Sequence, residues 1–294
     1  MNNKIGIIGG SGLYDLEGLT NKKCIPVKCG PFGKPSGDIL CGVMSGVEVF
    51  FLPRHGKNHS ISPSNIPFRA NIDSLKRLGC NDVISISAVG SLKEELKPGT
   101  FVLIDQFIDR TFHRKKTFFD KNIVAHVSMA EPTCKKTGEL VKKAANSLNI
   151  DMIEKGTYIV MEGPQFSSFA ESQLYRKWNC DVIGMTNMPE AKLAREAEIR
   201  YVSIAMVTDY DCWRENEDNV GVEEIVKTLL ENADKAKNLI KAFVKEFKIN
   251  RPNYIIDGVD NVLDSAIITS NVTNANFIEA GLDIIAKRII DANK

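Results

Sequence analysis

The chain has 294 residues, with 38 Lys and Arg against 37 Asp and Glu, which gives a formal net charge of +1. Such an even balance argues against a polybasic nucleic-acid arm and against an acidic tail. Hydrophobic residues make up 43% of the chain, and no apolar run approaches the roughly 18–20 residues of a membrane span. We therefore expect a globular protein without a nucleic-acid or membrane partner.

Seven cysteines are scattered along the chain without a CxxC pair, and the four histidines form no HExxH motif. An odd, scattered set of cysteines indicates reduced thiols and argues against a zinc site. The N-terminus lacks the features of a signal peptide. These observations predict a cytoplasmic protein with no structural metal.

Short apolar runs alternate with longer amphipathic segments. In chain order, the pattern predicts strands at residues 4–8, 47–52, 82–87, 101–104, 157–161, 182–185 and 201–207. Helical spacing predicts helices at residues 65–78, 137–148, 169–178, 189–197, 222–247 and 277–290. This alternation predicts an α/β fold with a central mixed β-sheet flanked by helices. We expect one domain over residues 1–250, with residues 251–294 as a C-terminal appendage packed on the same domain.

A glycine-rich turn at residues 9–12 directly follows the first predicted strand. The backbone N–H groups of such a turn, together with the Ser11 hydroxyl, can hold phosphate oxygens. The turn does not meet the dinucleotide-binding fingerprint, because Asp15 occupies the position of the third glycine. Taken alone, it is as well explained by a tight turn.

Two further strand ends carry groups that suit an anion. Arg54 and His55 follow the second predicted strand, and Ser87 and Ala88 follow the third. Arg is a bidentate phosphate ligand, and His can donate or shuttle a proton. Each pair by itself could be a surface Arg with a capping His or a plain turn. Because ligands of open α/β sheets bind outside the carboxyl ends of strands, the three turns together indicate a site for phosphate or a phosphate ester.

Three later segments could hold the rest of a ligand. Phe166 follows a Gly-Pro turn and is either a core aromatic or a wall for a planar ligand. Met185 and Thr186 follow a strand, where a core Met and a helix cap are the simpler explanation. Asp209 and Asp211 follow the last strand. They form either a solvated turn or a pair facing N–H donors, and a buried carboxyl there would have a raised pKa and could donate a proton.

In this order, the segments resemble the nucleoside phosphorylase superfamily, and within it the methylthioadenosine phosphorylase branch. The resemblance is carried by residues 5–13, 31–36, 54–56, 87–92, 104–111, 129–132, 162–168, 185–190 and 208–213, and it covers about residues 4–247. It implies phosphorolysis of S-methyl-5′-thioadenosine to adenine and 5-methylthioribose 1-phosphate, in purine and methionine salvage. It also implies a homotrimer that needs no cofactor, with inorganic phosphate as co-substrate.

The resemblance also implies a role for individual residues. The phosphate site would consist of Ser11, Arg54, His55, Ser87, the backbone of Ala88, and Thr186. The nucleoside would contact Met185 beneath the ribose, Phe166 at the purine, Asp209 and Asp211 at N7 and the 6-amino group, and Val222 and Ile225 at the 5′-alkylthio group. Ser167 would be a further substrate-binding residue. His126 would approach the sugar end of a neighbouring subunit's site. Asp209, Asp211 and His55 would be the catalytic residues.

The substrate preference depends on few positions. Asp209 suits a 6-aminopurine, because a carboxylate accepts from the amino group and a carboxyl donates to N7. The apolar Val222 favours a methylthio group over a 5′-hydroxyl. Gly184 and the Asn187–Met188 pair depart from the commonest form of their motif, as in relatives that handle methylthioinosine. Phosphorolysis of methylthioinosine or of ordinary purine nucleosides is therefore an alternative. Three further alternatives are a hydrolytic nucleosidase, a Rossmann-type nucleotide-binding protein, and a purely structural or partner-binding protein.

Overall fold

The structure is a computed structural model that describes residues 4–10, 13, 18–26, 28–214 and 222–293, with the backbone alone for residues 222–225. Its strands are β1 (Lys4–Gly9), β2 (Thr20–Ile25), β3 (Ile39–Met44), β4 (Val47–Pro53), β5 (Asp82–Ser91), β6 (Phe101–Ile104), β7 (Gln106–Arg110), β8 (Met152–Ile153), β9 (Thr157–Met161), β10 (Val182–Gly184) and β11 (Arg200–Asp209). Its α-helices are α1 (Phe68–Arg77), α2 (Lys135–Ser147), α3 (Phe169–Lys177), α4 (Asn187–Glu196), α5 (Val222–Asn250), α6 (Asn274–Glu279) and α7 (Lys287–Ala292).

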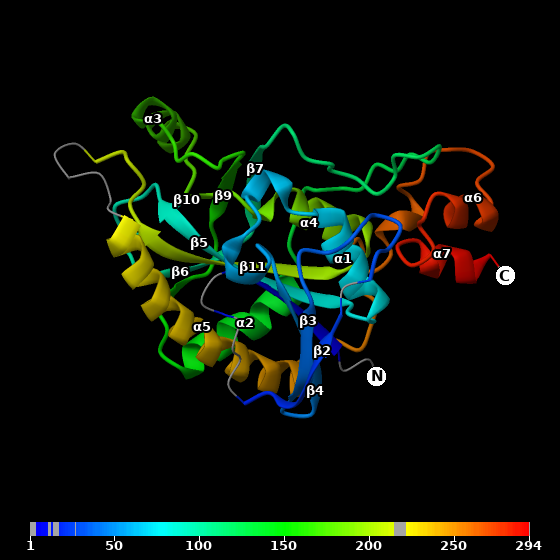
Figure 1. Cartoon of the computed structure of the whole chain (residues 1–294), viewed down its shortest axis with the longest axis horizontal. Coiled ribbons are helices and arrows are strands. Elements are labelled where there is room, and N and C mark those ends of the chain that lie inside the picture. The colour runs from blue at the N-terminus through cyan, green and yellow to red at the C-terminus, as the bar shows by residue number, and fades with distance from the viewer. Residues whose placement is uncertain (1–3, 11–12, 14–17, 27, 215–221, 294) are drawn as a thin grey trace.

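The strands form one mixed sheet with β5 at its centre (Figure 1). The order β2-β3-β4-β1-β5-β10-β9-β7 forms the main path, and β11 pairs with both β5 and β6. β5 runs parallel to β1 and β11 but antiparallel to β10. The predicted α/β fold with a mixed central sheet flanked by helices is therefore confirmed.

Helices cover both faces of this sheet. Helices α2 and α5 pack on one face and α1 and α4 on the other (Figure 1). Because side chains alternate along a strand, Ile5 and Ile7 of β1 join the core beneath α2 and α5, whereas Ile8 joins the core beneath α1 and α4. No helix in the described part of the chain is long and apolar enough to cross a membrane.

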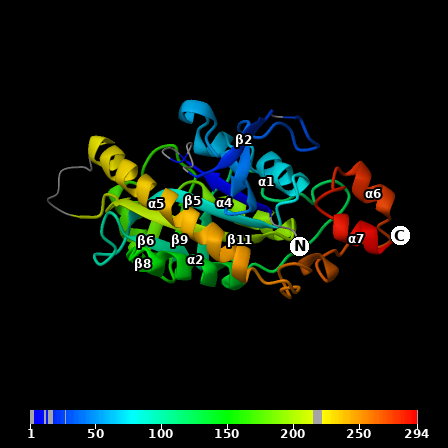
Figure 2. The ribbon, with the colours of Figure 1, turned by 90° about the horizontal axis from the view of Figure 1, so that it is seen from below.

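The segment after α5 lies at one end of the molecule, where α6 and α7 are side by side (Figures 1 and 2). Phe277, Leu282 and Ile285 are buried in the same core as α1 and α4. This packing supports the proposed description of residues 251–294 as an appendage on the same domain. The predicted helix at 277–290 is wrong, because Gly281 has a φ of +80° and a Cβ there would lie 2.6 Å from the Cβ of Pro31. The chain turns at that glycine and buries Leu282 and Ile285.

The other predicted helices occur within a few residues of their expected bounds. The pattern missed β2, β3, β7 and β8. It also ended the third strand too early, because Ser87 and Ala88 lie inside β5 and not in a turn after it. β2 is almost entirely exposed, so it has no buried face from which an alternating pattern could arise.

Candidate active site

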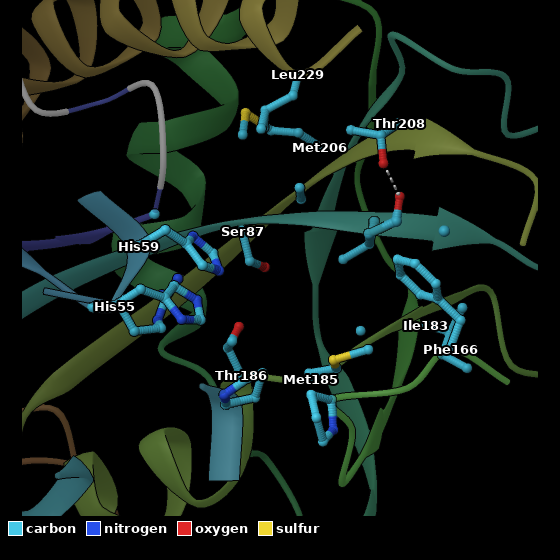
Figure 3. A pocket seen from close by; sticks show the side chains of 18 of the residues that line it. His55, His59, Ser87, Phe166, Ile183, Met185, Thr186, Met206, Thr208 and Leu229 are labelled. Carbon is cyan, nitrogen blue, oxygen red and sulfur yellow. Dashed lines mark hydrogen bonds between the residues drawn. The ribbon is translucent and has the colours of Figure 1, made fainter. Parts of the chain in front are cut away.

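A cavity of about 550 Å³ opens where several strands end. Its walls come from Gly10 after β1, from the loop 54–63 after β4, from the end of β5, from the segments around β9 and β10, and from the end of β11. Leu229 of α5 lies at one side (Figure 3). The cavity therefore lies where a doubly wound sheet is expected to bind a ligand.

The course of β5 opens this cavity. Its pairing with β1 ends at Ile86, and its pairing with β10 begins at Gly90, so residues 87–89 lie between the two partners on that edge. The Ile86 carbonyl points to this edge, where it accepts from Arg54 Nη1 at 3.0 Å. In a strand, the N–H and C=O groups of every second residue point to the same edge. The Ala88 N–H therefore points to the edge that the Ile86 carbonyl faces. It is therefore available to a ligand in the cavity.

Most of the predicted site residues lie around this one cavity. Its lining includes Arg54, His55, Ser87, Ala88, Phe166, Met185, Thr186, Asp209 and Asp211. Ser167 and His126 are not part of the lining: the Ser167 carbonyl accepts from Cys212 Sγ, and the His126 side chain is exposed. Ser11 lies outside the described residues, as do the side chains of Val222 and Ile225.

Arg54 is 1% exposed, and most of its guanidinium faces the interior. Its Nε donates to Glu190 Oε2 at 3.0 Å, and its Nη2 donates to Ser85 Oγ at 2.5 Å. The Ser85 hydroxyl and the Tyr201 hydroxyl both donate to Glu190 Oε1. These contacts hold the guanidinium firmly beneath the cavity, because a buried charge is stable only when paired and hydrogen-bonded.

His55 is neutral in this setting. Burial and the neighbouring Arg54 charge lower its pKa to about 4. Its Nδ1 lies 2.9 Å from the Ile61 carbonyl, which can only accept, so Nδ1 carries the hydrogen and Nε2 carries a lone pair. His59 stacks on it with ring centroids 4.1 Å apart (Figure 3). The ring is thus fixed in both orientation and tautomer.

Two hydroxyls face each other across the cavity near these imidazoles. Figure 3 shows the Oγ atoms of Ser87 and Thr186 directed into the space between β5 and the start of α4. Thr186 lies at the N-cap position of α4, although its side chain makes no cap hydrogen bond. Met188 has a φ of −119° and a ψ of 131°, so the regular turns of α4 begin only after it, and the hydroxyls are the groups that α4 and β5 offer to an anion here.

Asp209 and Asp211 lie at another part of the cavity wall. Asp209 Oδ1 accepts from the Asp211 backbone N–H at 2.8 Å, and Asp209 Oδ2 lies 2.7 Å from Thr208 Oγ1. Burial raises the pKa of both carboxyls, against the opposing effect of their hydrogen bonds. Asp211 has a φ of +53°, a conformation that Asp tolerates better than most residues. Burial thus works toward the protonated form of these carboxyls.

Apolar and aromatic groups complete the cavity. Phe166 is 67% exposed and lines the cavity beside Met185. Gly163 lets Met185 approach, since a Cβ there would lie 2.5 Å from the Met185 Sδ. Arg114 joins the two segments, because its Nη1 donates to the Met185 carbonyl and its Nη2 to the Glu162 carbonyl. Such a wall suits a flat, partly apolar ligand.

Several residues of this site were missed by the sequence interpretation. His59 is one of only four histidines in the sequence and lies in the same loop as His55, but the sequence pattern gives it no role. Glu190 falls within residues 185–190, which carry the family resemblance, but the resemblance assigns it no role. Leu229 follows the apolar periodicity of its helix, which by itself indicates only a buried helix face. Nothing in a single sequence shows that Glu190 meets Arg54 across 136 positions.

Comparisons with known proteins agree with this geometry. Residues 4–245 match the phosphorylase superfamily. The chain is 53% identical to the S-methyl-5′-thioadenosine phosphorylase of Rhodospirillum rubrum over 286 residues, which is 97% of each chain. It is 49% identical to that of Cereibacter sphaeroides over 290 residues, which is 99% of each chain.

Solved structures give the same answer. A methylthioadenosine phosphorylase from an antarctic soil metagenomic library superimposes with a TM-score of 0.88 at 44% identity, covering 96% of this chain and 98% of the other. The Schistosoma mansoni methylthioadenosine phosphorylase in complex with adenine gives a TM-score of 0.85 at 34% identity, covering 90% and 99%. The chain belongs to the phosphorylase superfamily, and within it to the S-methyl-5′-thioadenosine phosphorylase family.

Proposed function

We propose that this chain cleaves S-methyl-5′-thioadenosine with inorganic phosphate, giving adenine and 5-methylthioribose 1-phosphate. One observation carries the proposal: a single cavity has anion-binding groups at one part of its wall and two half-buried carboxyls with a raised pKa at another. The relatives that share about half of its residues over their full length are named for this activity. No further substrate or cofactor is needed to balance the reaction.

Phosphate would bind near His55, Ser87 and Thr186. The lone pair on His55 Nε2 suits the P–OH of hydrogen phosphate, and the Ala88 N–H and the two hydroxyls can donate to its other oxygens. Arg54 lines the cavity and supplies positive charge from beneath it. A phosphate held in this way is placed to attack the anomeric carbon of the sugar.

The base would leave toward Asp209 and Asp211. The C–N glycosidic bond breaks with its electron pair going to the purine, through an oxocarbenium-like sugar that the phosphate charge stabilises. A protonated Asp209 can give its hydrogen to N7, and Asp211 can accept from the 6-amino group. After that transfer the Thr208 hydroxyl, 2.7 Å from Asp209 Oδ2, can donate to the carboxylate that remains. The raised pKa of Asp209 favours the protonated starting state.

The remaining roles also stay proposals. Phe166 would contact the purine, Met185 would lie beneath the ribose, and Ser167 would be a further substrate-binding residue. Leu229, with Val222 and Ile225 on the same helix, would surround the methylthio group. A homotrimer would bring His126 of one subunit to the site of the next. Seven free cysteines support a reducing, cytoplasmic location.

The test is the release of base from methylthioadenosine, adenosine, methylthioinosine and inosine, each with and without phosphate. We expect phosphate-dependent release of adenine, fastest from methylthioadenosine. Hypoxanthine release from methylthioinosine with little adenine would overturn the assignment of the base-binding residues. Release that does not need phosphate would make the chain a hydrolase.

A further inference from the structure

Asn187 lies directly behind the proposed phosphate site. It is the first residue of α4, it follows Thr186, and it is 0% exposed. It does not itself line the cavity. Any influence on a bound ligand must therefore pass through the residues that it contacts.

The hydrogen bonds of Asn187 determine the orientation of its amide. Its Nδ2 donates to Tyr201 Oη at 2.8 Å and to Ser203 Oγ at 2.7 Å. The Tyr201 hydroxyl gives its only hydrogen to Glu190 Oε1, so it must accept from Asn187. The amide nitrogen therefore faces the buried network, and the amide oxygen faces the other way.

That oxygen contacts both hydroxyls of the cavity wall. Ser87 Oγ lies 3.0 Å and Thr186 Oγ1 lies 3.4 Å from Asn187 Oδ1. One carbonyl oxygen thus holds two hydroxyl groups that come from different elements, β5 and the start of α4. Each hydroxyl has one hydrogen, so Asn187 orders the two hydroxyls before an anion binds, and a bound anion takes over those hydrogens by rotation about the Cβ–Oγ bonds.

We propose that Asn187 is a positioning residue for phosphate: it sets the places of the Ser87 and Thr186 hydroxyl oxygens and connects them to the Arg54–Glu190 pair. The connection runs through Ser85 as well, because Asn187 Nδ2 lies 3.3 Å from Ser85 Oγ, which contacts both members of that pair. Asn187 departs from the commonest form of its motif, and the positioning of phosphate would explain the presence of an amide at this place. The inference rests on the proposed phosphate-dependent reaction.

Removing the amide would free both hydroxyls to turn away from the cavity. A phosphate would then have to order both side chains itself, which we expect to weaken its binding by roughly tenfold. For Asn187→Leu we therefore expect the Kd and KM of phosphate to rise on the order of tenfold, while the KM of the nucleoside changes less than about twofold. A purely structural role would instead lower kcat and the melting temperature and leave the phosphate KM unchanged.

Asn71→Leu is the matched control. Asn71 is 1% exposed, and its side chain accepts from Ser36, which does not line the cavity. It should lose stability without a change in phosphate affinity. Asn187→Ser, a smaller change, provides a second variant if Asn187→Leu does not fold.

Calorimetric titration of inorganic phosphate into the wild-type protein comes first. Failure of the wild type to bind phosphate overturns the proposed function. Binding by the wild type that is unchanged in both Asn187 variants overturns only the role of Asn187. A double-mutant cycle with Ser87→Ala completes the test, because an effect transmitted through that hydroxyl must shrink in its absence. Strict additivity would contradict the proposal.

Discussion

Glu190 of α4 and Arg54 at the end of β4 form an ion pair in which Nε lies 3.0 Å from Oε2 and both side chains are 1% exposed. The pair joins the two sides of the proposed phosphate site from below. Arg54 is therefore both a structural residue and a source of positive charge for the cavity. Its position depends on a carboxylate that lies far away in the chain.

Breaking this pair should be costly. For Glu190→Ala we expect a loss of about 3–5 kcal/mol in unfolding free energy, because the Arg54 charge is left buried without its partner. The exposed pair Arg214–Glu94 provides the control, and Glu94→Ala should cost at most about 1 kcal/mol. Urea unfolding at one protein concentration measures both. Equal losses of unfolding free energy in the two variants would show that the buried pair stabilises the fold no more than an exposed pair does.

Asp209 should act mainly on the chemical step. We expect Asp209→Ala to lose kcat by about 10²–10⁴-fold, since the leaving base loses its proton donor. Steady-state kinetics at saturating phosphate measure this effect. A raised KM with unchanged kcat would contradict the role of Asp209. Asp209→Asn should shift the preference toward 6-oxopurine nucleosides, because an amide NH2 has two hydrogens and can donate to N7 and to the neighbouring 6-carbonyl oxygen.

Gly184 should not tolerate even a methyl group. A Cβ at this position would lie 2.0 Å from the hydroxyl oxygen of the buried Tyr158. Overpacking of this kind costs typically about 1–3 kcal/mol, so Gly184→Ala should lower the melting temperature. The same change in a Tyr158→Phe background should cost less, because the nearest clashing atom is gone. Identical losses in the two backgrounds would mean that Tyr158 is not the obstacle.

Glu196 should make stability depend on pH. It is buried, accepts from the Phe118 N–H and the Thr117 hydroxyl, and burial raises its pKa to about 7 from the ordinary 4.5. The folded state therefore binds the proton more tightly than the unfolded state does. This contribution to stability is fully present below about pH 4.5 and is lost as the pH rises through about 7.

A Glu196→Gln variant isolates this contribution. Its melting temperature relative to the wild type should rise between pH 5 and pH 8, because Gln carries no charge to bury. Glu231→Gln on the exposed side of α5 is the control and should show little change. A pH-independent difference for Glu196→Gln would refute the explanation.

His126 should act on a neighbouring subunit. Its side chain is exposed and absent from the cavity lining of its own chain, while its backbone N–H is anchored to the Ala266 carbonyl at 2.8 Å. We expect His126→Ala to lower activity, and we expect hybrids co-expressed with Asp209→Ala subunits to regain part of it. If the hybrids are no more active than separately prepared His126→Ala and Asp209→Ala proteins, His126 does not act on the neighbouring site.

Local patterns were sufficient for much of this protein. Periodicity located the strand Lys4–Gly9 and the helix Val222–Asn250, because each buries one continuous stripe or run of apolar side chains. Arg54 directly after β4 and Ser87 near the end of β5 could be assigned to one site, because parallel strands end at the same edge of a sheet. Composition alone argued for reduced cysteines.

Tertiary structure decided the rest, because those features depend on contacts between distant parts of the chain. The pairing of Glu190 with Arg54, the stacking of His59 on His55 and the orientation of the Asn187 amide leave no periodic or spacing signal. The need for glycine at position 281 comes from the close approach of Pro31, which lies 250 positions earlier in the sequence. A sequence pattern indicates which face of an element is buried, but not which part of the chain covers that face. Folding determines this partner, and the partner determines the pKa and the hydrogen bonds of a polar group.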